Sequence, residues 1–149
     1  MKIEQEIKST KFHSNMQKAT VNLIFTSNWY INRINKYLKK YKLQNEQFNV
    51  LRILRGSSPD SLCVREIGNR MLMKNSNVPR ILERLEKKAL VTRTKSEDDK
   101  RESITILTQK AFDILSEIDN ELVDLEKNII NLTEGEAEIL NSLLDKMRI

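Results

Sequence analysis

Apolar residues recur every three to four positions over four long stretches of the chain, the spacing that places them on one face of an α-helix. The first stretch runs from about Met16 to Tyr41, and a shorter one covers roughly residues 46–55. Two more lie in the last third of the chain, at 109–129 and 133–147. The pattern therefore predicts a mostly helical protein.

Two shorter helices are expected in the middle of the chain. The first runs from Val64 to about Met71. The second begins after Asn75 or Ser76, either of which is a good N-cap residue, and reaches about Lys88. Pro79 would fall in the first turn of this second helix, where its missing N–H has no intrahelical partner to lose.

A β-hairpin is predicted directly after these helices. Residues 90–94 and 103–107 alternate and are rich in β-branched side chains, and the residues between them are almost all polar. Two short helices followed by a hairpin are the outline of a winged helix-turn-helix, in which one helix enters the major groove of DNA and the loop reaches the backbone beside it.

Charge is unevenly distributed along the 149 residues, which carry a net charge of +5. Residues 1–64 hold 11 basic and 4 acidic side chains, and residues 65–101 hold 11 and 6. Residues 102–149 hold only 4 basic and 11 acidic side chains. The basic part would attract a polyanion such as double-stranded DNA, and the acidic end would turn away from it.

The residue types needed for catalysis or metal binding are scarce. The chain has one cysteine, one histidine (His13) and three scattered glycines. A Cys-His pair, a metal site and a glycine-rich phosphate loop are therefore not expected, so we predict no cofactor and no enzymatic activity. No apolar run reaches the roughly 18 residues of a membrane span, and the start of the chain does not resemble a signal peptide. A cytoplasmic protein without a membrane partner is expected.

Basic residues lie where a winged helix-turn-helix would touch DNA. The candidates on the recognition helix are Ser76, Asn77, Arg80 and Arg84. The candidates on the wing and its flank are Arg93, Lys95, Lys100 and Arg101. The alternative is a solvated helix face in which the two helix arginines pair with Glu83 and Glu86. In the wing, the acids at 97–99 would repel phosphate if they faced it, so at least one is expected to pair with a nearby cation.

The first and last long helices have apolar stripes wider than a small winged-helix core could cover. Stripes of this kind usually meet a partner. A homodimer is the favoured interpretation, because it would present two recognition helices to a palindromic site. The alternative is that the two helices pack only on each other.

Four segments together resemble the MarR family of bacterial regulators. They are QFNVLRIL (47–54), VREIGNRM (64–71), NVPRILERLEKKALVTR (77–93) and DKRESITILT (99–108). The resemblance implies a single MarR-like domain over residues 1–149, with a DNA-binding lobe at about 45–108 and helical dimerisation regions at about 10–42 and 109–149. It also implies a homodimeric repressor of a palindromic operator that a small molecule releases.

The chain departs from the family pattern at three positions. Lys100 stands where arginine is usual, so the charge is kept but bidentate pairing is lost. Ala89 replaces the usual glycine after the recognition helix, which should strain that helix end. Cys63 takes an N-cap position that Ser or Thr normally holds.

The resemblance also suggests where an effector could bind. Ligands of similar proteins sit between the dimerisation helices and the winged domain, and Trp29, Arg33 and Phe48 could line such a crevice, although the two aromatic residues could equally be core. Two alternatives remain open for the function. One is a redox-sensing regulator that uses the Cys63 thiol, and the other is a non-sensing architectural or protein-interaction module.

Overall fold

The computed structural model describes the backbone of residues 1–95 and 103–148, and the side chains of these residues other than 124–128. The chain divides into two compact units, Met1–Phe112 and Asp113–Ile149. Each is described by itself below.

The first unit contains a long helix near its start, as the periodicity predicted. Helix α2 (Asn15–Leu38) starts at Ser14, whose Oγ accepts the Gln17 N–H at 3.1 Å, and a 3₁₀ turn, η1 (Lys39–Tyr41), ends it. A short helix α1 (Ile3–Glu6) precedes it and was not predicted. Helix α1 is held by the burial of Ile3, which is 5% exposed, and by an ion pair between Glu4 and Lys18.

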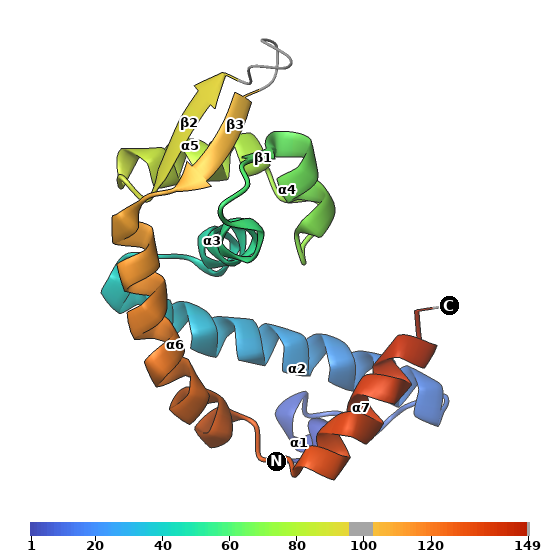
Figure 1. Cartoon of the computed structure of the whole chain (residues 1–149). Helices are drawn as coiled ribbons and strands as arrows, with labels where there is room; N and C mark the ends of the chain where they lie inside the picture. Colours follow the sequence, from blue (N-terminus) through green and yellow to red (C-terminus); the bar gives the residue numbers. More distant parts are fainter. Residues whose placement is uncertain (96–102, 149) are drawn as a thin grey trace. The chain divides into compact units, whose positions relative to one another are not determined.

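Three helices and a small sheet complete this unit. The helices are α3 (Asn45–Ser57), α4 (Val64–Arg70) and α5 (Val78–Lys87), and the strands are β1 (Leu62–Cys63), β2 (Val91–Lys95) and β3 (Ser103–Leu107). The strands form an antiparallel sheet in the order β1-β3-β2. The hairpin of β2 and β3 lies across α5, with α3 and α4 beside it (Figure 1). The predicted fold class, a mostly helical winged helix-turn-helix with a small β-wing, is confirmed.

One apolar core holds these elements together. Leu51 of α3, Ile67 of α4, and Leu82 and Leu85 of α5 are completely buried. Burying an aliphatic side chain of this size is worth about 1.5–3 kcal/mol. The buried residues fix the rotation of α5 and so decide which of its side chains face outward.

Three details of the predicted elements were wrong. The N-cap of α5 is Asn77, and not Asn75 or Ser76. Helix α3 continues through Gly56 to Ser57, two residues beyond its predicted end at about residue 55. Strand β1 was not predicted, because its two residues are extended only by pairing with Thr105 and Ile104 of β3.

Two helices make up the C-terminal part of the chain. Helix α6 (Gln109–Ile129) crosses the boundary between the units, and the Thr108 Oγ1 at its start accepts the Ala111 N–H at 3.3 Å. Helix α7 (Glu134–Lys146) lies wholly in the second unit and opens with a capping box of Thr133 and Glu136. None of the residues of α7 is buried. No helix in the described part of the chain is long and apolar enough to span a membrane.

The C-terminal end of α5 has the strained geometry that the sequence predicted. The Ala89 N–H donates to the Glu86 carbonyl at 2.8 Å and the Leu90 N–H to the Leu85 carbonyl at 3.0 Å, the pair of bonds that defines a Schellman motif. This motif needs a left-handed residue directly after the C-cap, and Ala89 has a φ of 56°. An alanine in this conformation costs about 1–2 kcal/mol.

An Ala89→Gly variant is therefore expected to be more stable than the natural protein. Glycine removes the left-handed penalty but loses about 0.5–1 kcal/mol in chain entropy, so the net gain is about 0.5–1 kcal/mol. Thermal unfolding should show a midpoint higher by about 2 °C. The same change at Ala19, an exposed position inside α2, should lower the midpoint. A lower midpoint for Ala89→Gly would contradict the strain.

Candidate nucleic-acid interface

The N-terminal end of α5 is built by local contacts. The Asn77 Oδ1 accepts the Arg80 N–H at 3.2 Å, and Pro79 lies in the first turn, as predicted. The buried face of the helix contains Val78, Ile81, Leu82 and Leu85. Arg80 and Arg84, which are one turn apart, consequently face outward and are exposed.

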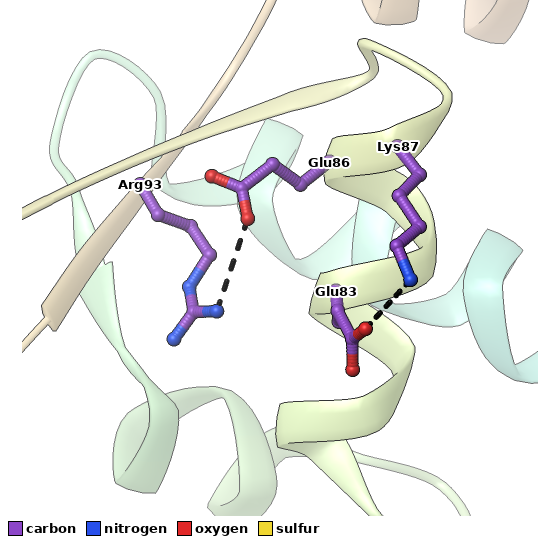
Figure 2. Close-up of polar contacts among 4 residues, drawn as sticks. All are labelled: Glu83, Glu86, Lys87 and Arg93. Carbon is purple, nitrogen blue, oxygen red and sulfur yellow. Dashed lines mark hydrogen bonds and ion pairs between the residues drawn. The ribbon is translucent and has the colours of Figure 1, made fainter.

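The acidic side chains of α5 are paired with other cations. Glu83 accepts from the Lys87 ammonium at 2.7 Å, and Glu86 lies 3.9 Å from the Arg93 guanidinium on β2 (Figure 2). The hydrogen bond from Lys87 holds the pKa of Glu83 below its usual range. Within the described residues, neither the Arg80 nor the Arg84 guanidinium has an ion-pair partner. The alternative in which these arginines pair with Glu83 and Glu86 is therefore not seen.

The two small polar residues proposed for DNA contact both make internal bonds. The Ser76 Oγ donates to the Glu46 carboxylate on α3 at 3.2 Å, and the Asn77 amide oxygen caps α5. Both residues still lie at the start of α5, beside Arg80. The four candidates of the recognition helix lie within residues 76–84, two of them just before α5 and two on its exposed face.

The wing candidates are only partly described. Arg93 is half-buried on β2 beside Glu86, and Lys95 is exposed at the end of the same strand. The expectations for Lys100, Arg101 and the acids at 97–99 lie outside the described residues. Strand β2, which carries both Arg93 and Lys95, packs against α5 within the first unit.

Sequence reasoning missed a second group of basic residues near the C-terminal half of α5. The Lys88 ammonium donates to the Lys42 carbonyl and to the Gln47 Oε1, the latter at 2.9 Å. Burial lowers the pKa of Lys88, and the nearby Arg84 charge lowers it further. Lys42 and Lys88 are 46 positions apart, so no local pattern in the sequence could have joined them.

The proposed effector residues separate into two places. Trp29 lines a cavity of about 230 Å³ beside α1, and the Arg33 guanidinium stacks 4.6 Å from the centre of its ring. Phe48 does not line this cavity and is instead covered by Arg52, 5.7 Å from its ring centre. With 36% of its surface exposed, Trp29 is not a core residue.

Cys63 is a structural capping residue in the folded protein. It is 5% exposed, and its backbone N–H donates to the Glu66 carboxylate at 2.8 Å, which holds the pKa of Glu66 low. A reactive sensor thiol needs access to solvent. The folded structure therefore does not favour redox sensing through Cys63.

Comparison with known proteins identifies the family. The model of the MarR family matches residues 43–103. The chain is 35% identical over 113 residues to the HTH-type transcriptional regulator MgrA of Staphylococcus aureus, an alignment that covers 76% of this chain and 75% of MgrA. The chain belongs to the MarR family. It is accordingly a winged helix-turn-helix, DNA-binding transcription regulator and not an enzyme.

Solved structures of MarR proteins share the fold. A MarR-like transcription regulator from Bacillus cereus superposes with a TM-score of 0.80 at 23% identity, covering 90% of this chain and 96% of the other. MepR of S. aureus in complex with DNA gives a TM-score of 0.77 at 22% identity, covering 86% and 94%. At this level of identity the likeness concerns the fold.

Proposed function

We propose that this MarR protein is a homodimeric repressor that reads a palindromic operator with α5 and its wing. The observation that carries the proposal is the row formed by Arg80 and Arg84, two exposed guanidiniums on a helix whose carboxylates are already paired elsewhere. Arginine pairs bidentately with guanine in the major groove. Lys95, Lys100 and Arg101 on the wing, with Arg93 behind them, would contact the DNA backbone or the minor groove.

The unburied apolar surface supports a homodimer. In α7 and at its C-cap, four large apolar side chains are between 44% and 62% exposed: Ile139, Leu140, Leu143 and Met147. In α2, Met16 and Ile24 are 81% and 57% exposed. A stripe of this kind on a helix is stable when a partner covers it. A second copy of the chain, joined through these terminal helices, would also supply the second recognition helix for a palindrome.

Repression and its release by a small molecule rest on the family resemblance. For the release we propose the cavity beside Trp29, where the indole ring would stack on an aromatic ligand. Arg33 and Phe48 do not line this cavity, and Arg33 is placed near it only by its stacking on the Trp29 ring.

Binding to the DNA upstream of its own gene tests the proposed function. Fluorescence anisotropy should show tighter binding to this DNA than to an unrelated duplex of the same length. Each phosphate contact should add roughly 0.9 to the slope of log affinity against log salt. Equal affinity for both duplexes, or no binding at low salt, would contradict a sequence-specific regulator.

A further inference from the structure

A basic cavity of about 360 Å³ lies beside the C-terminal half of α5, within the first unit. Its lining comes from the turn after α2, from the start of α3 and from the end of α5. The lining residues are Lys42, Gln44, Gln47, Arg84, Lys87 and Lys88. Four of these six side chains are cations, and no carboxylate lines the cavity.

The positive charge of this cavity is only partly compensated. Lys87 is neutralised by Glu83 at 2.7 Å. Among the described residues, neither Arg84 nor the Lys42 ammonium has an acidic partner. The pKa of Lys88 is lowered by burial and by the charge of Arg84, as expected where cations crowd together without an anion.

The cavity is also preorganised. The Lys88 ammonium is held by the Lys42 carbonyl and by Gln47, which is only 3% exposed. An ammonium has three protons, so one remains after these two bonds. The Lys88 carbonyl in turn accepts from the Lys110 ammonium at 2.9 Å, which adds a further cation close by.

We propose that this cavity binds a small organic anion with at least two negative charges, a phosphate monoester or a polycarboxylate. Its volume lies at the lower end of the roughly 300–1,000 Å³ of ligand pockets and exceeds what a bare phosphate needs. Arg84, Lys42 and Lys88 supply charged donors, and Lys88 is fixed by its two hydrogen bonds. Hydrogen bonds between charged partners are about twice as strong as neutral ones, so an anion with two charges would gain from bonding to several of these cations.

An anion bound in the cavity would affect DNA binding through Arg84. This residue lines the cavity and also follows Arg80 on the exposed face of α5. A bound anion would draw the Arg84 guanidinium away from DNA, so the anion and DNA would weaken each other's binding. This consequence rests on the proposed function, whereas the anion site itself does not.

Titration calorimetry on the DNA-free protein tests the site, with AMP and citrate as probes at constant ionic strength set by chloride. AMP binding alone would assign the site to phosphate esters, and citrate binding alone to polycarboxylates. Lys42→Gln and Arg84→Gln should each weaken binding by about tenfold or more. The control Lys36→Gln removes the same charge at an exposed position of α2 outside the cavity and should bind normally. No heat with either probe, or an equal loss in the control, would overturn the proposal.

A second measurement separates this site from DNA binding itself. Saturating anion should weaken binding to the upstream DNA in the natural protein and leave the Arg84→Gln variant unaffected. If Lys42→Gln instead lowers the salt slope of DNA binding by about 0.9, the cavity holds a phosphate of the DNA backbone and the free-anion proposal fails. If the natural protein binds the anion but does not bind DNA, the anion site is supported and the proposed function is rejected.

Discussion

A Leu143→Glu variant is expected to be monomeric and to bind operator DNA roughly 10²–10⁴-fold more weakly than the natural protein. Leu143 lies on α7 with 55% of its surface exposed, in the stripe that also contains Ile139 and Met147. A carboxylate there would be buried without a partner in the proposed dimer interface, at a cost of several kcal/mol. The monomer would then lose the second half-site contact that a dimer makes at high effective concentration.

The mass in solution and the DNA affinity measure the two parts of this prediction. Light scattering should give twice the 17.5 kDa of the chain for the natural protein and a single chain mass for Leu143→Glu. Asn141→Glu is the matched control, because it adds the same charge to α7 at an exposed polar position away from the stripe. A dimeric Leu143→Glu variant would exclude this face of α7 from the interface.

Replacing Arg80 by alanine is expected to weaken operator binding by about 5–150-fold, the equivalent of about 1–3 kcal/mol, and to relax the preference for the operator sequence. Arg80 is exposed on α5, and the cap bond from its backbone N–H to Asn77 survives in alanine. Thermal stability should therefore change little. Arg80→Lys should restore part of the affinity but not the base preference, since lysine keeps the charge and loses the bidentate geometry.

Anisotropy on the operator and on a duplex with altered half-sites would measure both effects. Arg33→Ala is the matched control, because it removes an exposed arginine from α2 that stacks on Trp29. If Arg80→Ala binds both duplexes as the natural protein does, α5 does not read bases through this residue.

Local sequence patterns carried much of the prediction. The helical periodicity located the start of α2 to within one residue and its end to within three. The strain at Ala89 was predicted from the resemblance to the MarR family, in which glycine is usual at this position, and Ala89 has the left-handed φ of a Schellman motif. The helical periodicity depends on contacts between residues three or four positions apart, which the sequence displays directly.

Competing local signals led to the errors. Asn75, Ser76 and Asn77 are all good N-cap residues, so composition alone could not choose among them. Asn77 is the N-cap, whereas the Ser76 hydroxyl bonds to Glu46 of α3, 30 positions earlier. Strand β1 also depends on a long-range contact, because its backbone is extended only where it pairs with β3.

The sequence by itself determined that this chain is a mostly helical winged helix-turn-helix, because amphipathic periodicity, caps and turn residues act over one or two turns of backbone. Only the tertiary structure decided which charges remain available. Glu86 pairs with Arg93 of β2, and Lys88 is fixed by the carbonyl of Lys42. Charge pairing depends on distances of a few ångströms between segments far apart in the chain, so the exposed arginines and the basic cavity emerge only when the chain is folded.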